Sequence, residues 1–169
     1  SVGDRVVVMP QFACGRCRYC LRGDHIYCPF PRDVLAETGS AAGAATYAQY
    51  VLKPDYLLLP VPDDVSLDHA AAACCLLGPG FHAAERMGVS TLDTVLVGGS
   101  GPVGIGAAIN GIVRGARVLA LETSPFRLER ARSMVLEAFD AFDPEPGAAI
   151  LAATGGSGAT VSVETTGVP

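Results

Sequence analysis

Short runs of β-branched and aliphatic residues, separated by turn residues, predict most of the strands of this chain. Strands are predicted over residues 4–9, 46–52, 56–59, 94–97, 116–121 and 159–165. An alanine-rich stretch predicts a helix over 67–76 with Ser66 as its N-cap, and a second helix over 81–87. Pro79 and Gly80 are predicted to break the two helices apart, and the Gly- and Ala-rich stretch 31–45 is predicted to be a loop.

The most informative stretch is Thr94–Ile112, in which an apolar strand passes through a glycine-rich turn into a helix of small residues. Gly99, Gly101 and Gly104 have the G-x-G-x-x-G spacing of dinucleotide-binding turns. The first glycine permits the tight turn, the second lets the backbone approach a pyrophosphate, and the third lets the helix lie close to the strand. The N–H groups at the start of the helix would then receive the phosphate charge.

The residues after this turn support the same interpretation, which would be weak from the glycines alone. The strand 116–121 is followed by Glu122, which lies 21 residues past the second glycine. A spacing of ~20 is expected for the acid that binds the adenosine ribose hydroxyls. This carboxylate favours NAD over NADP, because it would repel a 2′-phosphate. Arg127 lies nearby, in a helix that Ser124 and Pro125 are suited to start.

The same stretch allows a different interpretation, because residues 94–113 contain no charged side chain. Twenty such residues are long enough to span a bilayer as a helix. Six of these 20 residues are glycine, however, and Pro, Asn, Ser and Thr add further breaks and polarity. We therefore predict no membrane-spanning helix.

Four cysteines near the start of the chain predict a metal centre. Cys14, Cys17, Cys20 and Cys28 follow the pattern C-x2-C-x2-C-x7-C. The short spacers let neighbouring thiolates turn toward one ion, and the longer loop brings the last cysteine back to close a tetrahedron. Four cysteines leave no position for water or substrate, which is typical of structural zinc. Three arginines lie where they could offset the negative charge of such a site, namely Arg16, Arg18 and Arg22.

Two alternatives to zinc remain open at this stage. An iron–sulfur cluster is one, because Cys28-Pro29 partly resembles the end of a ferredoxin motif, although the x7 spacer does not fit. Disulfide pairing is the other, and it is disfavoured because the chain shows no export signal. His25 is expected to be an exposed loop residue rather than a ligand, since four thiols already satisfy zinc.

Composition and charge narrow the range of functions. The chain has 169 residues, 50% of them hydrophobic, and a formal net charge of −5. Mild acidity and the lack of basic runs argue against a nucleic-acid partner. We expect a cytoplasmic protein, because the cysteine pattern is typical of a metal site in a reducing compartment. The chain begins without Met, at Ser1, and we expect it to be a fragment.

Together these motifs resemble a known family. The matching pieces are GDRVVV at 3–8, the cysteine lobe at 14–28, TYAQYVLKPDYLLLPVPDDVSLDHAA at 46–71, GFHAAERM at 80–87, DTVLVGGSGPVGIGA at 93–107, ARVLALETSPFRLERAR at 116–132 and ATGGSGATVSVETTG at 153–167. They cover essentially the whole chain, which resembles the zinc-containing medium-chain dehydrogenase/reductase family of alcohol, sorbitol and threonine dehydrogenases.

The resemblance implies an α/β protein made of parts of two domains. Residues 1–76 would be the C-terminal part of a GroES-like β catalytic domain with a structural zinc lobe. Residues 77–169 would be the N-terminal part of a Rossmann domain, a doubly wound parallel sheet that binds NAD. The implied function is zinc-dependent, NAD-linked oxidation of an alcohol or polyol by a protein that is a homo-oligomer when full length, with no nucleic-acid or membrane partner.

The resemblance also assigns roles to particular residues. The structural zinc ligands would be Cys14, Cys17, Cys20 and Cys28. Cys75 falls where the family places its last catalytic zinc ligand, although a buried cysteine in an Ala-rich helix is the simpler interpretation from sequence. Cofactor binding is expected at Gly99, Gly101, Pro102, Val103, Gly104, Glu122 and Arg127. No metal role is expected for His69 or His82.

The departures from the family pattern limit what can be expected of this chain. In the family, the first catalytic zinc ligand and a Gly-His-Glu segment precede the GDRV strand, so the catalytic residues are not assigned and we expect an internal fragment that is inactive alone. Residues 133–143 lack the Gly-Ala-Asp turn that the family often has. The alternative function is a non-catalytic remnant that binds zinc and nucleotide.

Overall fold

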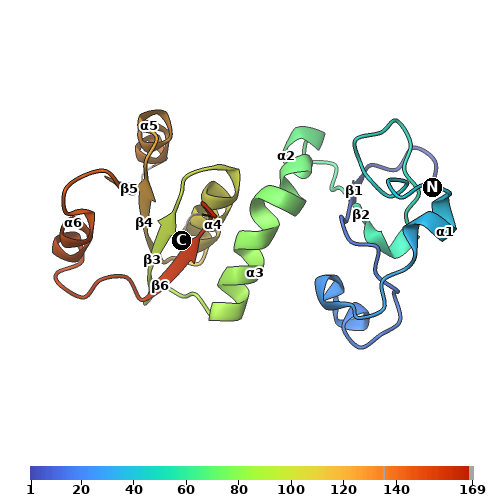
Figure 1. Cartoon of the computed structure of the whole chain (residues 1–169), viewed down its shortest axis with the longest axis horizontal. Helices are drawn as coiled ribbons and strands as arrows, with labels where there is room; N and C mark the ends of the chain where they lie inside the picture. Colours follow the sequence, from blue (N-terminus) through green and yellow to red (C-terminus); the bar gives the residue numbers. More distant parts are fainter. Residues whose placement is uncertain (135, 168–169) are drawn as a thin grey trace. The chain divides into compact units, whose positions relative to one another are not determined.

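The computed structural model describes residues 1–134 and 136–167, and the chain divides into two compact units. The first unit is Ser1–Cys74, which runs from blue to green in Figure 1, and the second is Cys75–Pro169, which runs from green to red. The assignment of residues 1–76 and 77–169 to two named domains stays a prediction.

The first unit contains one small antiparallel sheet and many short turns. Strand β1 (Val6–Val8) pairs with β2 (Leu58–Pro60), and Val7 lies opposite Leu59. β1 lies within the predicted strand 4–9, and β2 overlaps the predicted strand 56–59 but is shifted toward Pro60. The other elements are single helical turns over Cys20–Arg22, His25–Tyr27 and Asp55–Leu57, and the helix α1 (Val34–Thr38). A few buried side chains form the core of this unit, including Phe12, Ala13, Leu57 and Val61.

Two sequence predictions in the first unit are wrong. The stretch 31–45 is not all loop, because Asp33 accepts a hydrogen bond from the Ala36 N–H and so caps α1, a helix that Gly39 ends. The predicted strand 46–52 does not form. The side chains of Tyr47 and Tyr50 in this stretch are exposed to solvent. An alternating pattern marks one face of a strand but supplies no neighbouring strand to pair with.

The predicted break at Pro79 and Gly80 is also wrong. The chain remains helical through α2 (Leu67–Ala72), a π-helical segment (Ala73–Leu77) and α3 (Gly78–Met87). Ser66 caps α2 as predicted, since its hydroxyl accepts a 3.2 Å hydrogen bond from the His69 N–H. A proline disturbs the helix at the carbonyl four residues earlier, and the wider π turn lies just there and absorbs the disturbance.

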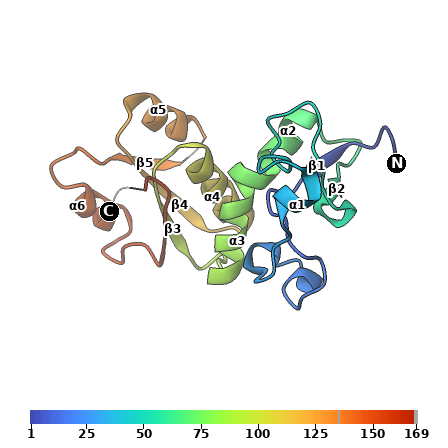
Figure 2. The same cartoon turned by 45° about the vertical axis from the view of Figure 1, so that its right-hand side comes forward.

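The second unit is built on a parallel sheet of strand order β5-β4-β3-β6, and Figure 2 labels three of these strands, β5, β4 and β3. Its strands are β3 (Thr94–Gly98), β4 (Arg117–Glu122), β5 (Glu137–Asp140) and β6 (Val161–Glu164). Its further helices are α4 (Pro102–Val113), α5 (Pro125–Ser133) and α6 (Pro146–Ala153). The chain moves outward from β3 to β5 and then returns to β6, so the strand order reverses between β3 and β6. In open α/β sheets, ligands bind at such a switch point, beyond the carboxyl ends of the strands.

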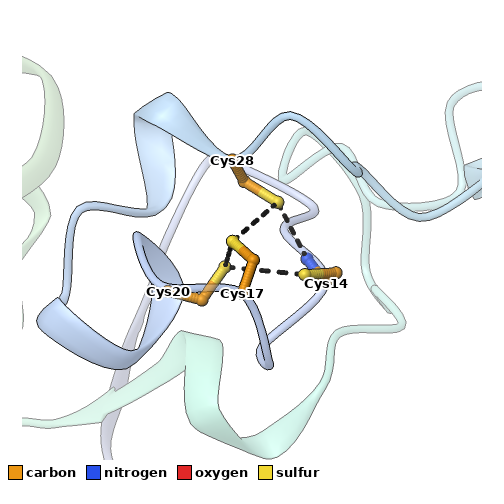
Figure 3. Close-up of side chains that lie close together, drawn as sticks. All are labelled: Cys14, Cys17, Cys20 and Cys28. Carbon is orange, nitrogen blue, oxygen red and sulfur yellow. Dashed lines mark hydrogen bonds between the residues drawn. The ribbon is translucent and has the colours of Figure 1, made fainter.

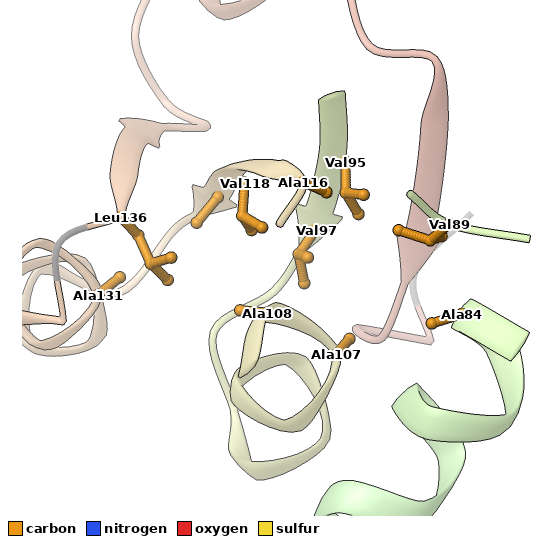
Figure 4. Packing of buried hydrophobic residues seen from close by; sticks show 11 residues of the cluster. Ala84, Val89, Val95, Val97, Ala107, Ala108, Ala116, Val118, Ala131 and Leu136 are labelled. Carbon is orange, nitrogen blue, oxygen red and sulfur yellow. The ribbon is translucent and has the colours of Figure 1, made fainter. Parts of the chain in front are cut away.

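Small side chains make the core of this unit thin. Right-handed crossovers place α4 and α5 on one face of the sheet and α6 on the other, and Figure 1 shows α4 and α6 on opposite sides. The core between the sheet and α3, α4 and α5 consists of valines, alanines and one leucine, ten of which Figure 4 labels. Because these side chains are short, the helices lie close to the strands, and a Cβ at Gly111 would lie 2.8 Å from Val118.

The apolar stretch 94–113 is divided between β3, the glycine turn and α4. Among the residues that the structure describes, no helix is both long and apolar enough to cross a membrane. Residues 94–113 therefore do not form one continuous helix.

The region around residues 133–153 contains elements that the sequence did not predict. These are the strand β5 and the helix α6, while Val135 lies outside the described residues. Arg117 on β4 holds them in place. Its guanidinium donates two hydrogen bonds to Glu137 on β5, at 2.8 and 2.7 Å, and one to the Ala153 carbonyl at the end of α6.

Asp93 precedes β3 and is expected to contribute stability that depends on pH. It accepts hydrogen bonds from the Ser90 N–H and hydroxyl and from the Thr160 hydroxyl, each at 2.9 Å. These bonds, that from the Ser90 N–H above all, hold the pKa of Asp93 below its usual value. A carboxylate with a lowered pKa stabilises the fold above its unfolded pKa of ~3.9 and loses this contribution as the pH falls.

We therefore expect Asp93→Asn to lower the melting temperature at pH 6. We also expect its melting temperature to change less than that of the wild type between pH 5 and pH 3, as followed by circular dichroism. Asp143→Asn, at an exposed loop position, is the matched control and should melt like the wild type. Identical pH profiles for Asp93→Asn and the wild type would contradict the assignment.

Candidate functional site

The four predicted cysteines lie together in the first unit (Figure 3). Their Sγ atoms all lie within 4.8 Å of one another. The Cys17 and Cys20 sulfurs are 3.5 Å apart, and two further pairs are 3.9 Å apart. A tetrahedral metal site with Zn–S bonds of ~2.3 Å places its sulfurs about 3.8 Å apart, so the cluster fits one ion.

These distances also bear on the disulfide alternative. A disulfide requires its sulfurs to be ~2.05 Å apart, well below the 3.5 Å separation of Cys17 and Cys20. No disulfide joins these four cysteines, and their arrangement is that of metal ligands.

Local turns aim the four sulfurs inward. Gly15, between the first two cysteines, has a φ of 76°, and Gly23 ends the turn that follows Cys20 with a φ of 85°. Both values lie in the left-handed region that favours glycine. The backbone N–H of Cys14 also points at the Cys28 sulfur, at a distance of 3.4 Å. Backbone donors around a sulfur stabilise its thiolate form, which is the form that binds a metal.

The pKa values of the thiols are shifted in opposite directions, and a bound cation would favour the thiolate form of all four. The N–H of Arg16 is the main cause that lowers the pKa of Cys14 to about 6, and the N–H of Cys20 likewise lowers the pKa of Cys17. Burial, in contrast, raises the pKa of Cys20 to about 12. Four thiolates at this spacing repel one another, so a divalent cation is needed for all four to lose their protons.

The lobe that carries the cysteines is closed at its neck. The Arg32 N–H donates a 2.8 Å hydrogen bond to the Phe12 carbonyl, which brings together the two ends of the segment 12–32. Lys53, only 9% exposed, donates to the carbonyls of Pro10 and Gln11 at 3.1 and 3.0 Å.

Tyr56 also holds the neck of the lobe. Its hydroxyl donates a 2.7 Å hydrogen bond to the Ala13 carbonyl. Its ring covers Gly15 so closely that a Cβ there would lie 2.6 Å from it. Lys53 and Tyr56 hold the lobe although they lie far from it in sequence, and sequence reasoning gave neither of them a role.

Three arginines and one histidine lie close to the cysteines in the sequence. Arg16, Arg18 and Arg22 are exposed, and the Arg18 guanidinium lies 4.6 Å from the centre of the Tyr19 ring. Their role in offsetting the charge of a metal site stays a prediction. His25 is half-buried rather than exposed, with its ring 6.3 Å from that of Tyr56.

The second candidate site is the glycine turn at the end of β3. Gly99 has a φ of 86°, which a residue with a Cβ adopts with strain. A Cβ at Gly104 would lie 1.9 Å from the Gly99 carbonyl oxygen, so only glycine lets α4 start here. At Gly101, in contrast, a Cβ would meet only an Arg127 nitrogen at 3.9 Å, so this side of the turn is open. Pro102 and Val103 follow as exposed residues in the first turn of α4.

Glu122 ends β4 beside this turn and is 4% exposed. Its carboxylate accepts hydrogen bonds from the N–H groups of Ser100, Thr123 and Ser124, at 2.6, 2.8 and 2.9 Å. Burial alone would raise its pKa, but these three donors and the charge of Arg127 hold the pKa of Glu122 below its usual value. Among these three bonds, Oε2 of Glu122 accepts only the one from Ser100. A carboxylate oxygen has lone pairs for more than one donor, so Oε2 could accept a further hydrogen bond.

Two further residues complete the turn. The Ser100 hydroxyl is buried and has no hydrogen-bond partner within the described part of the chain. Thr165, just after β6, donates to the carbonyls of Gly98 and Gly99 at 2.7 and 3.2 Å. Gly99, Gly104, Ser100 and Thr165 thus form a cradle at the switch point, with an unused polar atom that fits a polar ligand such as a dinucleotide. The motif gave no role to Ser100 or Thr165.

The remaining candidate metal ligand is Cys75. Cys75 lies in the π segment and is exposed. Among the described residues, the four-cysteine cluster is the only group of three or more His, Cys, Asp or Glu side chains that could hold a metal ion.

Comparison with known proteins identifies the family that this chain resembles. Residues 1–63 match the family profile of the alcohol dehydrogenase GroES-like domain. The chain is 34% identical over 139 residues to sorbitol dehydrogenase of Bacillus subtilis, a match that covers 79% of this chain and 37% of that protein. It is 34% identical over 170 residues to erythritol/L-threitol dehydrogenase of Mycolicibacterium smegmatis, covering 99% of this chain and 46% of that one. The chain thus spans less than half the length of these two relatives.

Solved structures give the same result for the fold. A NAD-dependent alcohol dehydrogenase matches with a TM-score of 0.84 at 31% identity, over 99% of this chain and 48% of that chain. Benzyl alcohol dehydrogenase of Acinetobacter calcoaceticus matches with a TM-score of 0.84 at 24% identity, which shows likeness of fold alone. The resemblance stated from sequence is confirmed, as is the α/β class with a partial Rossmann sheet.

Proposed function

Because this chain belongs to the zinc-type medium-chain alcohol dehydrogenase family, we propose that it is part of a zinc-dependent, NAD-linked enzyme that oxidises an alcohol or polyol to a carbonyl. The observation that carries this proposal is the presence, in one chain, of a four-thiol centre and a glycine turn closed by Glu122. Two of its relatives are named for polyols, sorbitol and erythritol, and this favours a polyol substrate.

The four-cysteine centre would hold structural zinc. Its ligands are the four clustered thiols of Cys14, Cys17, Cys20 and Cys28. Four protein ligands leave no open position, so the ion would stabilise the lobe and take no part in the reaction. A catalytic zinc would polarise the alcohol oxygen elsewhere, and Cys75 is the candidate ligand that this chain contributes to it.

The glycine turn would bind the dinucleotide, with the pyrophosphate against Gly101 and the first turn of α4. Pro102 and Val103 would shape that turn, Glu122 would accept hydrogen bonds from the adenosine ribose, and Arg127 would face the phosphates from beside Gly101. Bound NAD would supply the acceptor for the hydride. The residues of this chain would bind and orient it.

Cofactor preference tests the role of Glu122. We expect the protein to prefer NAD, because a buried carboxylate repels a 2′-phosphate. Glu122→Ala should weaken NAD binding about tenfold, or ~1.4 kcal/mol, and reduce the discrimination against NADP. Titration calorimetry with both nucleotides measures this, with Glu129→Ala on the exposed face of α5 as the control. A native preference for NADP would exclude the proposed role.

The alternative is a non-catalytic protein that binds zinc and nucleotide. Among the residues that the structure describes, Cys75 is the only one that we propose as a catalytic zinc ligand, and a catalytic zinc needs about three. We therefore expect the chain to bind NAD but to form no NADH above background in an absorbance assay with a panel of polyols and added zinc. Turnover that is lost on Cys75→Ala would contradict this expectation. We propose that the full-length protein is a cytoplasmic homo-oligomer. In the same assay it should form NADH if it is an enzyme, and none if it only binds zinc and nucleotide.

A further inference from the structure

Asn110 is a buried amide in a helix that is otherwise apolar. It lies on α4, the helix that begins at the glycine turn, and is 8% exposed. Its neighbours along α4, from Ile105 to Val113, are Gly, Ala, Ile and Val. Burying an amide costs free energy unless its donors and acceptor are satisfied. A buried polar side chain in such a helix therefore needs a structural reason.

The hydrogen bonds of Asn110 supply that reason. Its Nδ2 donates to the Leu77 carbonyl at 3.2 Å and to the Gly106 carbonyl at 2.8 Å. Its Oδ1 accepts from Arg114 at 3.3 Å. These partners fix the orientation of the amide, because two carbonyls require a donor and a guanidinium requires an acceptor.

The carbonyl that Asn110 binds belongs to the π segment. Leu77 is the last residue of Ala73–Leu77, in which the usual helical hydrogen bonds are replaced. The same segment lies against α4 at Gly106, where a Cβ would lie 1.8 Å from the Leu76 oxygen. One turn later, a Cβ at Gly80 would lie 2.6 Å from the Ala107 backbone. The backbone of the π segment therefore packs directly on α4, and Asn110 supplies the hydrogen bond from α4 to it.

We propose that Asn110 is a positioning residue that fixes the backbone of Cys75–Leu77 against α4. The role of Cys75 as a ligand rests on the proposed function, whereas the position of its backbone does not. Because α4 also starts at the glycine turn, one helix holds both the nucleotide site and the segment that carries Cys75. Asn110 thereby sets where the Cys75 thiol lies relative to the nucleotide-binding turn.

The test is hydrogen–deuterium exchange of the whole chain, followed on peptides that cover residues 74–81. Asn110→Leu has a similar shape but no donor, and Asn110→Asp keeps the acceptor and loses both donors. We expect amide exchange over 75–78 to be at least tenfold faster in both variants, with exchange in β3 and β4 unchanged. The rate of Cys75 alkylation by iodoacetamide, read by mass spectrometry, should change several-fold in both.

Arg114→Met is the matched control, because it removes the donor to Oδ1 and leaves Nδ2 in place. Its exchange over 75–78 should equal that of the wild type. Wild-type exchange in Asn110→Leu, or in Asn110→Asp alone, would overturn the proposal. If Asn110→Leu does not fold, Asn110→Ala adds no volume and carries the same test. Failure of the wild type to bind NAD would refute the proposed function and leave the exchange result unaffected.

Discussion

Cys28→Ser is expected to abolish tight zinc binding and to unfold the cysteine lobe. The fourth thiol closes the tetrahedron, and removing it leaves a three-sulfur site open to water and chelators. Structural zinc can supply on the order of 10 kcal/mol of apparent binding free energy, most of which the lobe would lose. Apolar burial within the lobe is small, because Leu21 and Ile26 are 76% and 64% exposed, so the hydrogen bonds at its neck would be left with little support.

Elemental analysis and chelator titration measure this effect. The purified wild type should contain close to one zinc per chain, and Cys28→Ser should contain almost none. Cys75→Ser is the matched control, since it removes an exposed thiol outside the cluster and should retain the zinc. Iron in place of zinc, or a Cys28→Ser protein with its full zinc content, would contradict the assignment.

Gly104→Ala is expected to lower stability, whereas Gly101→Ala is expected to weaken nucleotide binding. At Gly104 a Cβ would lie 1.9 Å from a backbone oxygen, so the turn must open. Overpacking of this kind costs about 1–3 kcal/mol or more, and the second unit should melt at a lower temperature. At Gly101 the φ is −70° and a Cβ would meet only a flexible arginine. Gly101→Ala should therefore fold normally and exclude the pyrophosphate.

Thermal melting and NAD titration together separate the two variants. Gly101→Ala should keep the wild-type melting temperature while its Kd for NAD rises at least about tenfold, a loss of ~1.4 kcal/mol. Gly147→Ala, at the start of α6 where a Cβ would meet nothing within 4 Å, is the matched control. Unchanged NAD binding in Gly101→Ala would show that the nucleotide does not lie against this turn.

Sequence spacing predicted the clustering of the four cysteines and the strand–turn–helix at the glycines, because each depends on local geometry. The intervals between Cys14, Cys17 and Cys20 determine which way the thiols turn, and only the return of Cys28 depends on a longer loop. The glycine spacing likewise reflects contacts within one strand–turn–helix unit, such as that between Gly99 and Gly104. Glu122 could be placed because parallel strands end at the same edge of a sheet.

The features that could not be predicted depend on partners distant in sequence. The alternating pattern of 46–52 indicates a strand only if a neighbouring strand pairs with it, and no described strand pairs with these residues. Pro79 would end an isolated helix, but packing on Gly106 and the hydrogen bond from Asn110 keep the chain helical. Strand β5 has few hydrophobic residues and is held by Arg117, 20 residues away from Glu137.

The closed neck of the cysteine lobe has a consequence for how this part of the chain can vary in length. The chain leaves at Phe12 and returns at Arg32, and one hydrogen bond joins these two points. We expect insertions or deletions between them to leave the path of the flanking backbone unchanged, because the exit and the re-entry already lie together. Residues 12–32 alone do not contain all the groups that hold the lobe, however. A host that received residues 12–32 would also have to supply an ammonium group like that of Lys53 and an aromatic ring like that of Tyr56.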